Sequence, residues 1–65
     1  MSSLFVLEMI GEGIEEKQLF EILKGYGYRE ENIKKNLEIL RRSGLIEYRD
    51  RTIRPTYKGS CLIKM

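Results

Sequence analysis

The sequence predicts a mainly helical α+β fold in which three helices precede a two-stranded β-hairpin. Three observations support this fold class. Ile33, Leu37 and Leu40 recur at i, i+4 and i+7, which places all three on one stripe of a helix. Gly44 follows them, where a residue without a Cβ can close the helix in the left-handed conformation. Residues 45–56 then hold two short runs of β-forming residues, which predict the hairpin.

The first two helices are predicted at residues 4–10 and 14–24. Ser2 or Ser3 is expected to be the N-cap of the first helix, and the glycines of residues 11–13 are expected to end it. The residues expected on its buried face are Leu4, Val6, Leu7 and Ile10. The stripe expected on the second helix consists of Leu19, Ile22 and Leu23.

A short turn is predicted between the second helix and the third. Gly25 is the expected end of the second helix, residues 26–28 form the turn, and the third helix begins near Arg29. Two helices joined by a short turn that contains glycine match the helix-turn-helix pattern. The outward side of the third helix is expected to carry Glu31, Lys34, Lys35, Glu38, Arg41 and Arg42, with Asn36 and Ile39 on its flank.

The hairpin is expected to turn at Asp50-Arg51. On its first strand Ile46 and Tyr48 alternate with polar residues, and on its second strand Ile53 does the same. Pro55 cannot donate to a strand ladder, so the second strand is predicted at the edge of a sheet. After it, Thr56 is expected to cap a last short turn that reaches the end of the chain.

The composition predicts one small domain covering residues 1–65 and excludes several chemistries. A chain of this length buries only about 60% of its unfolded surface. The single cysteine, Cys61, allows no internal disulfide, and the absence of histidine excludes imidazole catalysis and histidine metal sites. No apolar run approaches the roughly 20 residues that span a bilayer. We therefore expect a cytoplasmic protein that is not an enzyme and holds no cofactor.

Charge is distributed unevenly along the chain. Residues 1–28 carry two lysines against five glutamates, a net charge of −3. Residues 29–58 carry nine basic against five acidic residues, a net charge of +4. A basic half beside an acidic half is typical of nucleic-acid binding. A charged but merely solvated surface is the alternative interpretation.

Self-association is a further expectation, because a chain this small gains stability from a partner. Phe5 and Met9 lie on the far side of Glu8 from the buried face of the first helix, and we expect them in a dimer contact together with Leu62. The alternative is that Phe5 packs under the C-terminal tail of its own chain.

Two stretches of the sequence carry a resemblance to a known family. The first is Leu37-Glu38-Ile39-Leu40-Arg41-Arg42-Ser43-Gly44-Leu45-Ile46, and the second is Ile53-Arg54-Pro55-Thr56-Tyr57-Lys58-Gly59. At this spacing the chain resembles winged helix-turn-helix transcription regulators of bacteria and archaea, from about Ile14 to Gly59. In that group a leucine-containing helix ends in Gly-Leu-Ile, and a threonine followed three positions later by glycine closes the wing.

The resemblance implies a protein that binds double-stranded DNA. Because the net charge of +2 is low for a DNA binder, we expect a homodimer that presents two copies of the basic residues. The helix over residues 29–42 would be the recognition helix in a major groove, and the hairpin would be the wing. The implied DNA-binding residues are Arg29, Lys34, Lys35, Arg41, Arg42, Arg49, Arg51 and Arg54. Asn36 is a possible adenine reader. The alternative function is a winged-helix module that binds protein, as a small subunit or adaptor, because the same fold serves both roles.

Overall fold

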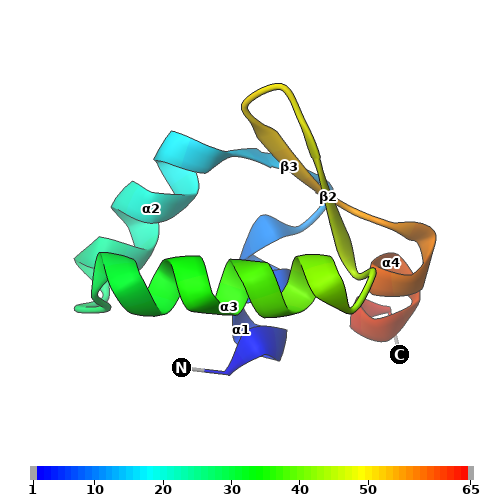
Figure 1. Cartoon of the computed structure of the whole chain (residues 1–65), viewed down its shortest axis with the longest axis horizontal. Coiled ribbons are helices and arrows are strands. Elements are labelled where there is room, and N and C mark those ends of the chain that lie inside the picture. Colours follow the sequence, from blue (N-terminus) through cyan, green and yellow to red (C-terminus); the bar gives the residue numbers. More distant parts are fainter. Residues whose placement is uncertain (1, 65) are drawn as a thin grey trace.

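The computed structural model describes residues 2–64, which form a small, mostly helical α+β fold with four helices and a three-stranded antiparallel sheet (Figure 1). The elements are α1 (Ser3–Ile10), β1 (Ile14–Glu15), α2 (Glu16–Gly25), α3 (Glu30–Arg42), β2 (Ile46–Arg49), β3 (Thr52–Pro55) and α4 (Tyr57–Ile63). The predicted set of three helices and two strands therefore lacked β1 and α4.

The sheet has three strands, in the order β1-β3-β2, and the prediction of a two-stranded wing was wrong. Ile14, which was expected to begin the second helix, pairs instead with Ile53 of β3. The backbone N–H of Glu16 then donates to the carbonyl oxygen of Arg51 at 2.8 Å. The start of α2 is therefore tied to the tip of the hairpin. A strand of two residues is too short to show alternation in the sequence, so the pattern there predicts helix.

β3 is the central strand, so its predicted position at the sheet edge was also wrong. β1 reaches only Thr52 and Ile53, whereas Pro55 lies beyond it and pairs with Ile46 on the other side. Pro55 has no N–H to donate, but β1 does not extend as far as Pro55, so no hydrogen bond between β1 and β3 is lost.

The turn between α2 and α3 closes the end of α2 in the same way that Gly44 closes α3. Gly27 has a φ of 95°, and the N–H of Tyr28 donates to the carbonyl oxygen of Leu23. Gly44 has a φ of 75°, and the N–H of Leu45 donates to the carbonyl oxygen of Leu40. Both are Schellman closures, which need a residue that tolerates positive φ. The glycine that closes α2 is therefore Gly27, two residues after the predicted end.

α4 extends the expected C-terminal turn to a helix of seven residues. The Thr56 hydroxyl caps it as predicted, accepting from the N–H of Gly59 at 3.2 Å. The same hydroxyl donates to the carbonyl oxygen of Gly44 at 2.6 Å, and the Lys58 ammonium donates to that of Ser43 at 3.2 Å. The beginning of α4 therefore satisfies carbonyl groups just past the end of α3.

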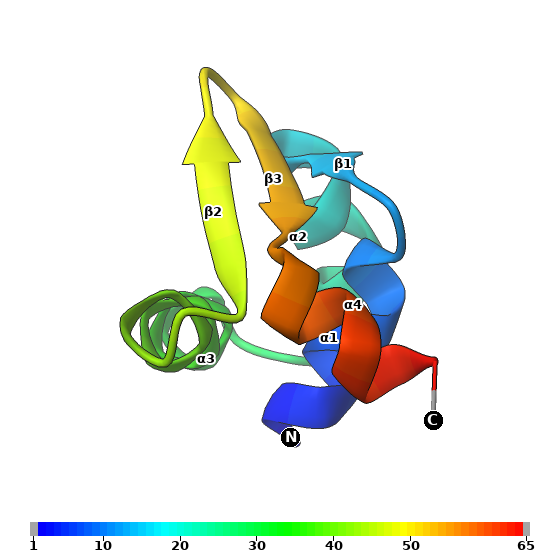
Figure 2. The ribbon, with the colours of Figure 1, turned by 90° about the vertical axis from the view of Figure 1, so that its right-hand side faces the viewer.

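The hydrophobic core lies where α1, α2 and α3 meet the inner face of the sheet (Figures 1 and 2). Its buried residues are Val6, Leu7, Ile10, Leu19, Leu23, Ile33, Leu37, Leu40, Ile46 and Ile53. These include the predicted stripe of α3 and two of the three apolar hairpin residues, Ile46 and Ile53, whereas Tyr48 is largely outside the core. Leu4 is an exception to the predicted face of α1, since it is 48% exposed. The core thus fixes α3 with its polar side outward.

Candidate nucleic-acid interface

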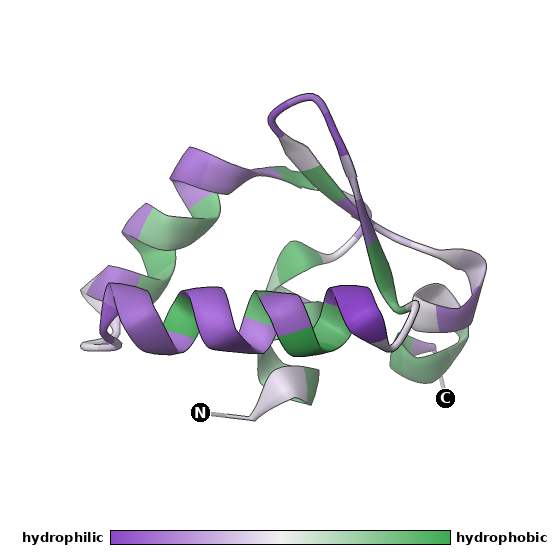
Figure 3. Ribbon diagram, in the orientation of Figure 1, coloured by the Kyte–Doolittle hydropathy of each residue, from purple (hydrophilic) through white to green (hydrophobic). Residues whose placement is uncertain are grey.

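All eight basic residues predicted to bind DNA are exposed. Arg29 is the N-cap of α3, and the other seven lie on α3, on the hairpin strands or in the hairpin turn. Figure 3 shows hydrophilic residues along the length of α3 and at the hairpin tip. The two elements that the sequence singled out therefore both present positive charge to solvent.

α3 carries its cations in two lines that lie outside its buried stripe. Lys35 and Arg42 are seven residues apart, which is about two helical turns, so they lie on one line along the helix. Lys34 and Arg41 have the same spacing and form a second line about 100° away around the helix, with Glu31 and Glu38 between the two lines. The four side chains give α3 a basic face about two turns long.

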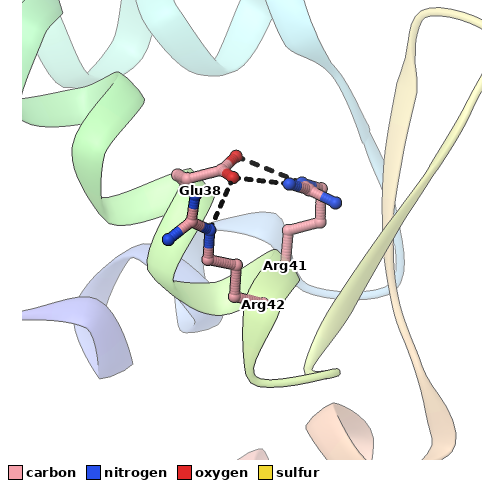
Figure 4. Close-up of polar contacts among 3 residues, drawn as sticks. All are labelled: Glu38, Arg41 and Arg42. Atoms are coloured by element: carbon pink, nitrogen blue, oxygen red, sulfur yellow. Dashed lines mark hydrogen bonds and ion pairs between the residues drawn. The ribbon is translucent and has the colours of Figure 1, made fainter.

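Glu38 interrupts this face and binds both arginines of its last turn (Figure 4). Its carboxylate accepts from Nε and Nη2 of Arg41 and, at 3.0 Å, from Nε of Arg42. The hydrogen bond from Arg41 lowers the pKa of Glu38, with a smaller contribution from Arg42. The same bond raises the pKa of Arg41. Neither arginine is thus a free cation in the isolated chain.

The hairpin arginines lie at two places, on the outer face of the strands and at the tip. Side chains alternate between the two faces of a strand, so Arg54 and its neighbour across the sheet, Glu47, lie opposite the buried side of Ile53. Arg49 pairs with Thr52 and shares that outer face. Arg51 lies in the turn, next to Asp50, which adopts a φ of 57°. The hairpin therefore divides its positive charge between its tip and its outer face.

Arg51 and Lys34 line one open groove of about 590 Å³ between α2, the first half of α3 and the hairpin tip. The residues that line it are Glu15, Glu16, Lys17, Phe20, Glu21, Lys24, Glu30, Lys34 and Arg51. Across it Lys24 pairs with Glu30 at 3.7 Å. No local pattern indicated that Lys17 and Lys24 approach the predicted residues, because tertiary packing alone brings them there. The groove carries equal numbers of acidic and basic groups.

Tyr48 lies on the inner face of β2 near the same region. Partial burial raises the pKa of its hydroxyl, and the nearby carboxylate of Glu16 adds to the effect. Tyr48 is 41% exposed, so its ring remains partly in contact with solvent.

The Asn36 amide is occupied within the chain. Its Nδ2 donates to the carbonyl oxygen of Asn32 at 2.9 Å, and its Oδ1 accepts from the Ser3 hydroxyl at 2.9 Å. The bond from Ser3 joins α3 to the beginning of α1, and the two bonds together hold the orientation of the amide. The sequence indicated the flanking position of Asn36 but not its partner.

The residues predicted for a dimer contact lie in two places. Phe5 is half-buried, and its ring makes an edge-on contact with Tyr26, with centroids 5.9 Å apart, and a tilted contact with Tyr28. Met9 also packs against the core, whereas Leu62 on α4 is 42% exposed. Phe5 therefore braces α1 against the turn between α2 and α3.

Two further findings bear on the class of site. Within residues 2–64 no helix is both long enough and apolar enough to cross a membrane. Across the same residues no three acidic or cysteine side chains gather in a way that would hold a metal ion.

Comparison with protein-family models, with curated proteins and with solved structures finds no match.

Proposed function

We propose that the chain is a winged helix-turn-helix protein that binds double-stranded DNA as a homodimer and regulates transcription. In this proposal α3 is the recognition helix, and the hairpin of β2 and β3 is the wing. The observation that supports the proposal most is the basic face of α3. It is exposed to solvent because the apolar stripe on the other side of the same helix is buried in the core.

The connection between α2 and α3 supports the assignment of the recognition helix. Four residues separate the two helices, and Gly27 supplies the positive φ that the turn requires. This is the length and chemistry of a helix-turn-helix connection. The hydrogen bond from Glu16 to Arg51 further ties the wing to the start of α2. A duplex that met α3 would therefore meet a wing held at a fixed position.

The charge of the site supports a phosphate backbone as the first target. Lys34 and Lys35 extend from the first half of α3, and Arg49 and Arg51 extend from the wing. Phosphate contacts of this kind give most of the affinity and fix the register of a protein on the duplex. Arg41 and Arg42 are paired with Glu38, so the contribution of each subunit is modest. Two copies of the face would raise the affinity, which is why a homodimer is part of the proposal.

The proposal is tested by fluorescence anisotropy with a random-sequence duplex. Replacing Lys34 and Lys35 by alanine removes two exposed charges from the proposed interface. Lys64→Ala is the matched control, since Lys64 is equally exposed but follows α4. We expect the double variant to lose at least about tenfold in affinity at low salt and the control to bind within twofold of the native chain. Equal binding by all three proteins would contradict the proposal.

A second candidate function is protein binding, as a small subunit or adaptor. Leu4 and Ile39, both 48% exposed, are the observation that favours it. Ile39 lies on the flank of α3, next to the line formed by Lys35 and Arg42. Under this alternative, Ile39→Asp abolishes partner binding and the wing arginines are dispensable. Under DNA binding, Ile39→Asp weakens duplex affinity modestly, whereas replacing Arg49 and Arg51 with alanine weakens it strongly.

A further inference from the structure

Glu38, Arg41 and Arg42 form a cluster, which we call the α3 triad. A helix face that only attracted phosphates would not need a carboxylate paired with its arginines. A helix that binds phosphates gains most when its guanidinium groups are free. Here one carboxylate occupies two of them, although it lies on the same outward side of the helix (Figure 4). Exposed pairs at these spacings also stabilise a helix without any ligand, so the donors that they leave open decide what the cluster can bind.

The arrangement leaves specific donors available on both arginines. Among residues 2–64, Arg42 donates only through Nε, so its two terminal nitrogens remain open and its side chain is 77% exposed. Arg41 donates through Nε and Nη2, which leaves Nη1. Two parallel N–H donors on a planar group match the O6 and N7 acceptors of guanine. A carboxylate that holds the guanidinium in place reduces the rotamer freedom that Arg42 would lose on binding.

Glu38 contributes chemistry of its own to the same edge. A carboxylate accepts hydrogen bonds from the N4 amino group of cytosine. It also repels phosphates, so it lowers the affinity for a backbone contact without lowering the affinity for a base edge that donates. The acceptor Glu38 and the donors Arg41 and Arg42 thus lie on one turn of the helix. A G·C pair needs both, because guanine accepts hydrogen bonds in the major groove and cytosine donates one.

We propose that the α3 triad reads G·C base pairs in the major groove, with Arg42 and Arg41 donating to guanine while Glu38 positions them and accepts from cytosine. This inference rests on the proposed function, because it assigns the base-reading part of the same interface. Lys34, Lys35 and the wing then provide backbone contacts, and the triad provides sequence preference.

The experiment is selection of bound duplexes from a library with a randomised core, carried out with the full chain and its variants. Glu38→Gln keeps the shape of the side chain and loosens both arginines. Arg42→Lys keeps the charge and removes the fork. Glu31→Gln is the matched control, since Glu31 lies seven residues before Glu38 on the same side of α3 and is exposed. Circular dichroism of each variant checks that α3 still forms.

We expect the native chain to enrich duplexes with G·C pairs at fixed positions. Its preference for an enriched duplex over a scrambled one should fall about tenfold or more with Glu38→Gln and Arg42→Lys, and should persist with Glu31→Gln. In the Glu38→Gln protein the affinity for the scrambled duplex should rise, because two arginines become free.

The outcomes separate the triad from the proposed function. If the native chain binds duplex but selects no sequence, or if Glu38→Gln selects the same sequences as the native chain, the triad assignment is overturned and DNA binding stands. The same holds if Glu31→Gln and Glu38→Gln change the preference equally. If the native chain binds no duplex at low salt, the proposed function fails and the triad fails with it.

Discussion

Gly59 of α4 lies directly on the backbone of Leu45, at the point where α3 passes into β2. A Cβ atom built on Gly59 would overlap the carbonyl oxygen of Leu45 and lie 3.0 Å from its carbonyl carbon. That oxygen already accepts the N–H of Thr56 at 3.0 Å, so it has little freedom to move. The two stretches of sequence that carry the winged-helix resemblance therefore meet at this contact.

Gly59→Ala should destabilise the chain by about 1–3 kcal/mol, because the added methyl group forces α4 away from Leu45. Chemical denaturation of the two proteins measures the difference. Gly25→Ala is the control, since Gly25 also lies in a helix but has no atom within 4 Å of an added Cβ. The control should be neutral or up to about 1 kcal/mol more stable. A Gly59→Ala protein as stable as the native chain would refute the close contact.

Thr56→Val should cost about 1 kcal/mol, because it removes both the cap of α4 and the donor to Gly44 while preserving the shape of the side chain. Thr56→Ser keeps the hydroxyl and should retain most of the stability. Thermal unfolding followed by circular dichroism compares the three proteins. Equal losses in both variants would show that the hydroxyl plays no part.

Glu38 should titrate below its ordinary pKa of 4.5, because the hydrogen bond from Arg41 favours the charged carboxylate. Because the pKa of Glu38 is lower in the folded chain, its ion pairs contribute to stability at pH values above the ordinary pKa. This contribution is lost as the pH falls through the pKa of the folded chain. Carbon NMR of the Glu38 carboxyl group measures the pKa. Arg41→Gln should raise it more than Arg42→Gln does. An unshifted value in the native chain would contradict the pairing.

Tyr48 should make the fold less stable at alkaline pH. Its folded pKa lies above the ordinary value of 10.0, so the unfolded chain loses the proton first, and stability falls as the pH rises through that window. Tyr48→Phe should therefore show a smaller decline above pH 10 than the native chain. Tyr57→Phe is the control, since Tyr57 is 88% exposed, and it should decline as the native chain does. Denaturant midpoints at neutral and alkaline pH provide the comparison.

Local signals in the sequence were enough to predict α1, α3 and the hairpin to within about a residue. Ser2, Gly44 and Thr56 act where caps and closures were expected, because their chemistry depends on near neighbours in the chain. β1 was missed because it exists only through its pairing with β3. The additional helix α4 depends on Gly59, which fits against a segment fourteen residues away in the sequence.

The candidate site was predictable in its composition and less so in its arrangement. Exposure of the cations on α3 follows from the buried stripe of the same helix. The ion pairs of Glu38 with Arg41 and Arg42 were also predictable from the sequence, since i,i+3 and i,i+4 spacings bring such groups together on a helix. By contrast, the bond between Asn36 and Ser3 and the groove shared by Lys34 and Arg51 join distant parts of the chain. No periodicity in the sequence encodes these relationships.

The central claim is that the basic side of α3 and the wing together contact a DNA backbone. The most direct measurement is the affinity of the native chain for a random-sequence duplex as a function of salt, with sedimentation on the same samples. If Lys34, Lys35, Arg49 and Arg51 each neutralise one phosphate, log K should fall against log salt with a slope of about −3.6 per subunit, doubled in a dimer. No binding at low salt, or binding that does not respond to salt, would contradict the account.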